Sequence, residues 1–301
     1  MKIAISGLGK MGSQIAQMLK KEGHEVFAHD TDIDQRKRAT EAGLQVFDNP
    51  INVVHAFGSE RIVIWLMIPS QFVDEALNVW LNLLQAGDVI IDGGNSDYRQ
   101  TIIHSQKAAS NQVDFLDIGT SGGILGMENG FSLMVGGYKE TYEYCEPFVK
   151  ALSLPNGNYK YLGPSGAGHF IKMVHNAIEY GMMESLAEGY RLIKDGPYRN
   201  INLVSVAQVW QKGSIIESSL NGLAVEIFKE NPELEGIDGF VAESGEARWA
   251  LESAKTQGFE MPSIKAARQV RLDTKTGEVN YATKFLAALR NKFGGHAINK
   301  Q

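Results

Sequence analysis

A glycine-rich turn near the start of the chain constrains its fold more than any other feature. The segment GLGKMG at residues 7–12 follows a β-branched run, Lys2–Ser6, which predicts a strand, and it opens an amphipathic stretch, Met11–Lys21, which predicts a helix. In this context the glycines of G-x-G-x-x-G allow a tight turn, close approach of the backbone to a pyrophosphate and close helix–sheet packing. The helix N-terminus then faces the anion. The turn therefore predicts a dinucleotide-binding βαβ unit.

Strand-like and helix-like segments alternate through the first half of the chain. Arg61–Met67 and Asp88–Asp92 are continuous apolar runs, as in strands buried on both faces, and a helical pattern, Gln71–Leu84, separates them. A further helix is expected at Ile33–Ala42, and further strands at Glu25–Ala28, Leu44–Phe47, Asp114–Ile118 and Phe131–Val135. This alternation predicts an α/β fold with a doubly wound, mostly parallel, Rossmann-like sheet.

The pattern changes after Gly163. A long segment with a period of 3.6 residues runs from Gly166 to Lys194, and helical patterns continue to the C-terminus, where strand-like runs are scarce. We therefore expect two domains in this chain of 301 residues: an NAD-binding Rossmann-like domain at residues 1–163 and an all-helical domain at residues 164–301.

Charge is distributed unevenly along the chain. The 29 basic and 35 acidic residues give a net charge of −6, which argues against a general nucleic-acid binder. Residues 261–301 carry eight Lys and Arg against two acids, or +6, so the first 260 residues carry 21 basic and 33 acidic residues, or −12. The basic end predicts a solvated helical face, an anionic ligand or a partner subunit.

Several classes of protein are excluded by composition. No apolar run reaches the roughly 18–20 residues that span a bilayer, and the start of the chain is a poor signal peptide. The single cysteine, Cys145, excludes an intramolecular disulfide and a multi-cysteine metal site. We therefore expect a soluble, cytoplasmic protein with no nucleic-acid partner and no membrane partner. The sequence shows no cluster of metal ligands, so we also expect no metal.

An acidic residue follows the second predicted strand. Asp30 lies 18 residues after Gly12, where a carboxylate accepts hydrogen bonds from a ribose diol and repels a 2′-phosphate. Arg36 and the two basic residues after it lie a helical turn or more beyond the strand, so NADP stays open as an alternative. We expect NAD as the cofactor.

Four polar residues share one face of the long helix that is expected after residue 166. Lys172, His175, Asn176 and Glu179 are spaced i, i+3, i+4 and i+7 on a helix that is otherwise apolar. A base, an imidazole, an amide and a carboxylate in one stripe form either a catalytic site or a solvated polar face. The dinucleotide-binding turn in the same chain favours the catalytic site.

In these motifs the chain resembles the β-hydroxyacid dehydrogenases, and specifically the short-chain decarboxylating 6-phosphogluconate dehydrogenases. The pattern Lys-x-x-His-Asn-x-x-Glu-Tyr is the specific one, since related 3-hydroxyisobutyrate-type enzymes usually show Lys-x-x-Asn-Asn there. The resemblance covers nearly the whole chain and rests on GLGKMG (7–12), DGGNS (92–96), SGG (121–123) followed by GMENG, KMVHNAIEYG (172–181) and the closing RNKFGGH (290–296).

The resemblance implies oxidative decarboxylation of 6-phosphogluconate to ribulose 5-phosphate and CO2, with hydride transfer to NAD. Lys172 would be the general base, and Glu179 would be the acid that protonates the enol. The alternative is an NAD(P)-dependent dehydrogenase of another 3-hydroxy acid, such as 3-hydroxyisobutyrate. A dinucleotide sensor without catalysis is a third class, against which the presence of both Lys172 and Glu179 argues.

The remaining site residues are expected as contacts. For the cofactor these are Gly7, Leu8, Gly9, Lys10, Met11, Gly12, Asp30, Met67, Ile68 and Asn95. For the substrate, a sugar-acid phosphate, the resemblance implies Asn95, Ser121, Gly122, Gly123, His175, Asn176, Tyr180, Arg248, Arg271, Arg290 and His296.

Four of these, Tyr180, Arg271, Arg290 and His296, would bind the phosphate. In the family the closing Arg and His come from a neighbouring subunit, which implies a homodimer or homotetramer. Arg248 can meet a phosphate, but Ala250 has no hydroxyl where the long-chain branch has threonine.

Overall fold

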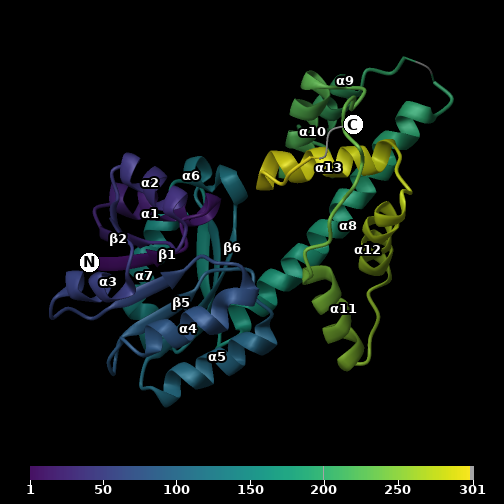
Figure 1. The fold of residues 1–301 in the computed structure, drawn as a ribbon. Coiled ribbons are helices and arrows are strands. Elements are labelled where there is room, and N and C mark those ends of the chain that lie inside the picture. Colours follow the sequence, from purple (N-terminus) through teal and green to yellow (C-terminus); the bar gives the residue numbers. More distant parts are fainter. Residues whose placement is uncertain (199, 299–301) are drawn as a thin grey trace. The chain divides into compact units, whose positions relative to one another are not determined.

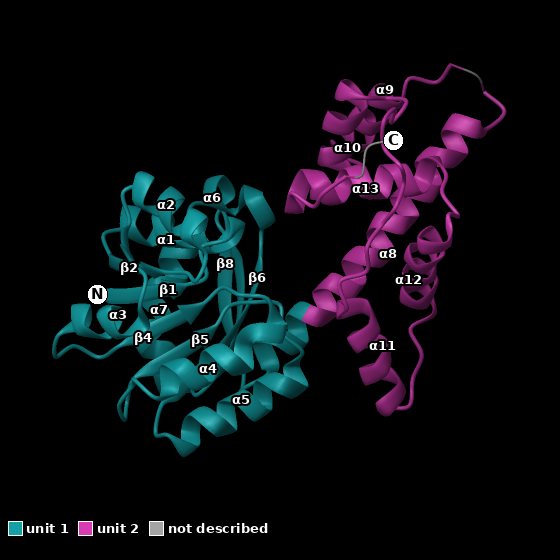
Figure 2. Ribbon diagram, viewed as in Figure 1, with its two compact units in different colours: residues 1–172 teal, residues 173–301 magenta. Residues whose placement is uncertain are grey.

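A computed structural model describes residues 1–198 and 200–298 of the protein. The chain divides into two compact units, residues 1–172 and 173–301 (Figure 2). The division falls inside one long helix, α8 (Ala167–Asp195), whose extent agrees with the long periodic segment of the sequence.

The first unit is built on an eight-stranded sheet with the order β3-β2-β1-β4-β5-β6-β7-β8. Figure 1 labels β1, β2, β5 and β6 of this sheet. Every neighbouring pair is parallel except β6 and β7, which are antiparallel. The predicted doubly wound, mostly parallel sheet is therefore confirmed. Its strands are β1 (Lys2–Ser6), β2 (Glu25–His29), β3 (Gln45–Phe47), β4 (Val63–Leu66), β5 (Val89–Asp92), β6 (Asp114–Ser121), β7 (Ser132–Gly137) and β8 (Asn158–Gly163).

Helices bury both faces of this sheet. One face packs on α1 (Lys10–Lys21) and α7 (Lys139–Ser153), whose Phe148 joins the buried cluster. The other face packs on α3, α4 and α5, and every residue of β4 and β5 is buried as a result, which explains their continuous apolar runs. The bounds of these and the remaining helices of the unit are α2 (Ile33–Glu41), α3 (Pro50–Phe57), α4 (Val73–Leu81), α5 (Tyr98–Ser110) and α6 (Gly126–Asn129).

Several elements of the first unit were not predicted from the sequence. α3 and α5 are short or weakly patterned, and α7 contains Pro147, a residue that usually ends a helix. β8 lies at the edge of the sheet and alternates exposed with half-buried residues, so it carries no continuous apolar run. Tertiary packing, rather than local pattern, determines these elements.

The second unit has an aromatic centre. The rings of Phe228 and Phe285 stack at 5.2 Å between centroids, and Tyr190 of α8 meets both rings edge-on. The helices that supply and surround this core are α9 (Leu203–Trp210), α10 (Ser219–Glu230), α11 (Glu246–Thr256), α12 (Pro262–Asp273) and α13 (Tyr281–Gly294). A helical C-terminal domain is therefore confirmed.

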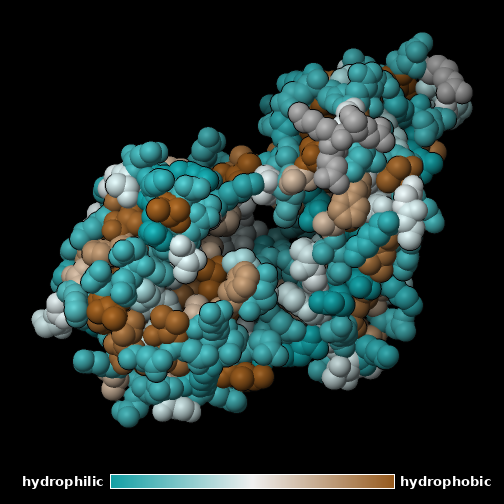
Figure 3. Space-filling model, viewed as in Figure 1, coloured by the Kyte–Doolittle hydropathy of each residue, from teal (hydrophilic) through white to brown (hydrophobic). Residues whose placement is uncertain are grey.

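The visible face of each unit is mostly hydrophilic, and its hydrophobic residues lie in separated patches (Figure 3). Among the described residues, no helix combines the length and apolar character needed to cross a membrane.

Candidate active site

The glycine-rich turn leaves an open approach at the start of α1. A Cβ on Gly7, whose φ is +101°, would lie 2.5 Å from the carbonyl oxygen of Met67, and one on Gly12 would lie 1.9 Å from the carbonyl oxygen of Gly7. Both positions therefore require glycine. A Cβ on Gly9 meets no atom within 4 Å, and no side chain caps the helix that Gly9 begins. The backbone N–H groups of this turn thus fit the pyrophosphate of a dinucleotide.

Asp30 is held beside this turn. Its Oδ2 accepts a hydrogen bond from the Leu8 backbone N–H at 2.6 Å, and its Oδ1 accepts one from the Asp32 N–H at 2.8 Å. Arg36 reaches further than the sequence analysis expected, since its Nη1 donates to the carbonyl oxygens of Asp30 at 2.8 Å and Thr31 at 2.9 Å. A carboxylate and a guanidinium therefore both lie at the carboxyl end of β2.

The carboxyl ends of β4 and β5 extend the same edge of the sheet. Met67 and Ile68 follow β4, and both pack against Gly7 of the glycine-rich turn. At the end of β5, the buried carboxylate of Asp92 accepts hydrogen bonds from the Gly94 N–H at 3.1 Å and from the Ser96 hydroxyl at 2.7 Å. These bonds hold the turn that carries Asn95.

The carboxyl end of β6 leads into two glycines with positive φ. Ser121 is the last residue of the strand, and Gly122 and Gly123 follow with φ of +138° and +56°. Residues with a side chain rarely adopt either conformation. The tight turn therefore places backbone N–H groups next to the Ser121 hydroxyl, which is an arrangement suited to an anion.

A buried carboxylate holds the start of α8. Asp117, fully buried in β6, accepts hydrogen bonds from the backbone N–H of Gly166 at 2.8 Å and of His169 at 2.9 Å. A negative charge at a helix N-terminus stabilises the first turn. Our sequence analysis did not select Asp117, although an acid inside an otherwise apolar strand was an available signal.

Lys172 lies one turn further along α8 and is 6% exposed. A Cβ on Gly119 of β6 would lie 2.4 Å from the Lys172 Cβ, so strand and helix meet there without an intervening side chain. His169, one turn before Lys172, is buried, and its Nδ1 lies 2.7 Å from the Thr101 hydroxyl. Lys172 is thus held by its direct contact with Gly119 of β6, and the preceding turn of α8 is held by the contact between His169 and Thr101.

Further along α8, three members of the polar stripe form a chain of contacts with α11. The Asn176 Nδ2 donates to Oε1 of Glu246 at 3.2 Å, and the Asn176 Oδ1 lies 3.0 Å from Nδ1 of His175. That same Nδ1 lies 3.9 Å from Oε2 of Glu179. Glu246 is 5% exposed. The sequence analysis did not select it as a site residue, because nothing in the sequence distinguishes Glu246 from the other acidic residues.

Two buried arginines lie near Tyr180. The Arg271 guanidinium carbon is 3.2 Å from the centroid of the Tyr180 ring, and Arg271 and Arg290 are 2% and 8% exposed. Burial lowers the pKa of both guanidinium groups, and the charge of Arg290 lowers that of Arg271 further. Among the described residues, no ion pair joins either arginine to a carboxylate, although the charges of Glu179 and Glu184 raise the pKa of Arg271 and those of Glu246 and Glu179 raise the pKa of Arg290. Two buried positive charges of this kind form a site for an anion.

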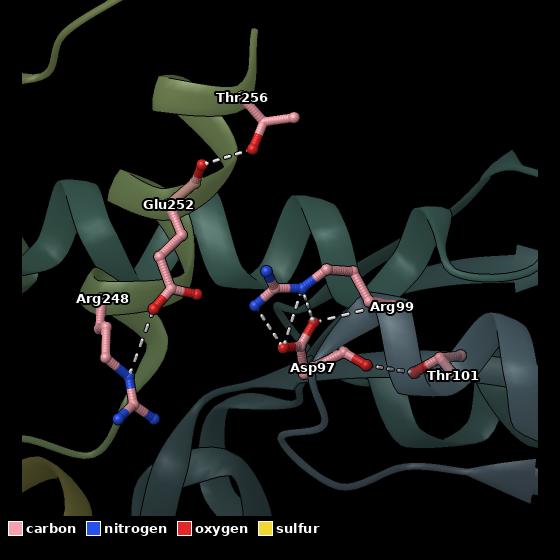
Figure 4. A network of polar contacts seen from close by, with 6 residues as sticks. All are labelled: Asp97, Arg99, Thr101, Arg248, Glu252 and Thr256. Carbon is pink, nitrogen blue, oxygen red and sulfur yellow. Dashed lines mark hydrogen bonds and ion pairs between the residues drawn. The ribbon is translucent and has the colours of Figure 1, made fainter.

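The other two expected phosphate residues lie at the surface. Arg248 has a half-exposed side chain whose Nε lies 4.0 Å from Oε1 of Glu252 on α11, as drawn in Figure 4. The same view shows the ion pair of the exposed Arg99 with the half-buried Asp97 at the start of α5. His296 is exposed beside Phe293. The structure therefore groups Tyr180, Arg271 and Arg290, which belong to one chain, and places Arg248 and His296 outside the buried group.

Glu184 is a further buried acid near this group. It lies one turn after Tyr180 on α8 and is 8% exposed. Burial, and to a smaller extent the charge of Glu188, raises the pKa of its carboxyl to about 7, and the charge of Arg271 opposes this rise. A titration near neutral pH is therefore coupled to the arginine.

The described residues contain no cluster of three or more His, Cys, Asp or Glu that could hold a metal ion. Cys145 is buried, and burial raises the pKa of its thiol to about 12, so it is not a reactive thiolate.

Comparison with known proteins identifies both parts of the chain. Residues 2–163 match the NAD binding domain of 6-phosphogluconate dehydrogenase, and residues 168–278 match the C-terminal domain of the same enzyme. YqeC of Bacillus subtilis, provisionally named a 6-phosphogluconate dehydrogenase, is 36% identical over the full length of both chains. An NAD(+)-dependent, decarboxylating 6-phosphogluconate dehydrogenase of Haloferax volcanii is 33% identical over 100% of this chain and 99% of its own.

Solved structures show the same fold. The 6-phosphogluconate dehydrogenase of Plasmodium falciparum superimposes with a TM-score of 0.81 at 26% identity, over 96% of this chain and 70% of its own. A 3-hydroxyisobutyrate dehydrogenase of Mycobacterium tuberculosis has a TM-score of 0.75 at 21% identity, over 97% of this chain and 98% of its own. The fold and site define an oxidoreductase with a dinucleotide-binding domain and a helical second domain. Within that class, the chain belongs to the 6-phosphogluconate dehydrogenase family.

Proposed function

We propose that the protein oxidises and decarboxylates 6-phosphogluconate, giving ribulose 5-phosphate and CO2, with NAD as the hydride acceptor. The observation that carries this proposal is the group formed by Tyr180, Arg271 and Arg290. A small 3-hydroxy acid such as 3-hydroxyisobutyrate bears one carboxylate and has no second anionic group that could bind to the buried Arg271 and Arg290. A substrate with both a carboxylate and a phosphate supplies an anion for each part of the site.

The phosphate is assigned to the two buried arginines. Their planar guanidinium groups each present parallel donors that match phosphate oxygens, and charge-assisted bonds of this kind are about twice as strong as neutral ones. The ring of Tyr180 keeps Arg271 in place by stacking on its guanidinium. We further assign Arg248 and His296 to the outer side of the phosphate, where exposed residues can still contribute.

Lys172 is proposed as the general base. Its amine, in the neutral form, would take the proton from the C3 hydroxyl of the substrate. When bound, the nicotinamide ring supplies the acceptor for the hydride that leaves C3. The resulting ketone is β to the carboxylate, and the Lys172 ammonium, now protonated, would donate a hydrogen bond to the ketone oxygen.

Glu179 is proposed as the acid of the second half of the reaction. The C1–C2 bond breaks, CO2 leaves, and the electron pair forms an enolate that the Lys172 ammonium stabilises. Glu179 would then donate a proton to the carbon that becomes C1 of ribulose 5-phosphate. Both residues lie on α8, spaced by two helical turns.

The remaining groups are proposed to orient the substrate. The Ser121 hydroxyl and the N–H groups of Gly122 and Gly123 would bind the carboxylate. His175 and Asn176 would bind sugar hydroxyls. Asn95 would lie between the nicotinamide and the substrate.

The cofactor is assigned to residues 7–12, Asp30, Met67 and Ile68. Asp30 keeps acceptor capacity for a ribose diol and supports NAD, whereas Arg36 at the same strand end would favour NADP. We also propose that residues 1–163 form the NAD-binding domain and that residues 164–301 form the substrate domain. We further propose that the protein is a homodimer or homotetramer, and analytical sedimentation measures this oligomeric state.

A substrate panel tests the function. We expect kcat/KM with NAD to be highest for 6-phosphogluconate, and at least about 100-fold lower for gluconate because the phosphate contacts are lost. Equal or better turnover of gluconate or 3-hydroxyisobutyrate would contradict the proposal. The same assay with NADP measures the cofactor preference.

A further inference from the structure

Glu246 contacts the polar stripe of α8 from a different helix. It lies in the first turn of α11, which begins after Gly245, a residue with φ of +109°. Its side chain is buried, and its Oε1 is the acceptor for Nδ2 of Asn176 at 3.2 Å. The Glu246 carboxylate therefore determines how the Asn176 amide is oriented.

The orientation of the Asn176 amide follows from donor and acceptor chemistry. The Nδ2 of the Asn176 amide donates to Oε1 of Glu246, so the amide turns its Oδ1 away from that carboxyl group. The Oδ1 then lies 3.0 Å from Nδ1 of His175. An amide oxygen can only accept a hydrogen bond, so Nδ1 of the imidazole must carry the hydrogen.

We propose that Glu246 is a positioning residue that sets the tautomer of His175 through Asn176. In the neutral ring, the hydrogen is held on Nδ1, and Nε2 is the acceptor. The inference rests on the proposed function in one respect, because His175 and Asn176 are there assigned to the sugar hydroxyls. An imidazole that presents Nε2 accepts an O–H from a polyol, whereas the other tautomer would present an N–H.

A second carboxylate, that of Glu179, also influences the tautomer of His175, and its influence must be distinguished from that of Glu246. Oε2 of Glu179 lies 3.9 Å from Nδ1 of His175, beyond hydrogen-bond distance, and its charge favours the same tautomer. The two contributions are distinguishable, because only Glu246 acts by orienting the amide. Substitution of Glu246 by Gln keeps the size of the side chain but lets that side chain donate as well as accept, so the Asn176 amide is free to turn over.

The tautomer is measured directly by long-range 1H–15N NMR of the protein labelled with 15N-histidine, at about pH 8.5, where a typical imidazole is neutral. The His175 signals are assigned by their loss in His175→Gln. We expect the Nδ1–H form in the native protein, a mixture of both forms in Glu246→Gln and Glu246→Ala, and no change in Glu260→Gln, an exposed acid between α11 and α12.

Kinetics supply the second readout. We expect Glu246→Gln to raise KM for 6-phosphogluconate about tenfold, the loss of roughly one hydrogen bond, with a smaller change in kcat and an unchanged thermal midpoint. An Nε2–H form in the native protein, or a shift of tautomer in Glu179→Gln but not in the Glu246 variants, would overturn the inference. The NMR measurement needs no turnover, so it stands apart from the test of the proposed function.

Discussion

Lys172 of α8 packs directly on Gly119 of β6, where a Cβ on the glycine would lie 2.4 Å from the Cβ of the lysine. The absence of a side chain on the strand thus determines how close the proposed base can lie to the carboxyl ends of the sheet. Asp117, two residues earlier on the same strand, holds the helix in that position through its N-terminus.

We expect Gly119→Ala to displace Lys172 and to lower kcat by at least about tenfold, because a misplacement of 1 Å can reduce a rate by more than that. The added methyl should also lower stability by about 1–3 kcal/mol through overpacking. The control is Gly189→Ala on α8, the helix that carries Lys172, where a Cβ meets no atom within 4 Å. That variant should keep full activity and gain stability.

Removal of a buried arginine should weaken binding of the phosphate. We expect Arg290→Ala and Arg271→Ala to raise KM for 6-phosphogluconate about 10–100-fold, with a smaller effect on kcat, since the contact is made before and during the reaction. Arg290→Lys should recover only part of the loss, because a lysine lacks the planar fork. Arg191→Ala, an exposed arginine on α8 near Asp195, should change neither constant. Equal KM values in all four variants would remove the phosphate assignment.

Asp30 should govern the choice of cofactor. Asp30→Asn keeps an acceptor for the Leu8 N–H but removes the charge that repels a 2′-phosphate, while Arg36 remains at the strand end. We expect kcat/KM for NAD to fall and that for NADP to rise, changing their ratio by about tenfold or more. Asp34→Asn, an exposed acid on α2, should leave the ratio unchanged. An unaltered ratio in Asp30→Asn would place cofactor discrimination elsewhere.

Glu184 should make stability depend on pH. Its pKa is about 7 in the folded protein against 4.5 for an unperturbed carboxyl, so the folded state holds the proton more tightly. Its contribution to stability is therefore fully present below about pH 4.5 and falls by about 1.4 kcal/mol per pH unit up to about pH 7. The stability of Glu184→Gln relative to the native protein should rise over this interval and then stay constant.

Denaturant unfolding at several pH values measures this difference, and Glu235→Gln, an exposed acid, serves as the control. A constant difference between native protein and Glu184→Gln from pH 4.5 to 7 would mean that the carboxyl titrates normally.

Local features of the site could be predicted from the sequence. The glycine-rich turn between β1 and α1 and the stripe that begins at Lys172 are both short-range patterns, in which spacing alone fixes the geometry. The family resemblance indicated Arg271 and Arg290 as phosphate residues but implied that the closing arginine comes from a neighbouring subunit. That the two arginines of one chain lie together was not predicted, because nothing local connects α12 and α13.

The residues that hold the site residues in place could not be predicted from the sequence. Asp117 bonds to a residue 49 positions away, and Glu246 bonds to Asn176 across 70 positions, so only the tertiary fold brings them together. The reach of Arg36 back to Asp30 was misjudged because a long side chain spans more than the helical turn that separates the two backbones.

The central claim is that oxidation and loss of CO2 occur in one reaction in this protein, and the ratio of CO2 to NADH tests it most directly. With 6-phosphogluconate labelled at C1, we expect one labelled CO2 for each NADH, and Lys172→Ala should abolish both while NAD still binds. Formation of NADH without labelled CO2 would show a dehydrogenase that does not decarboxylate, and undiminished turnover in Lys172→Ala would show that the base is another residue.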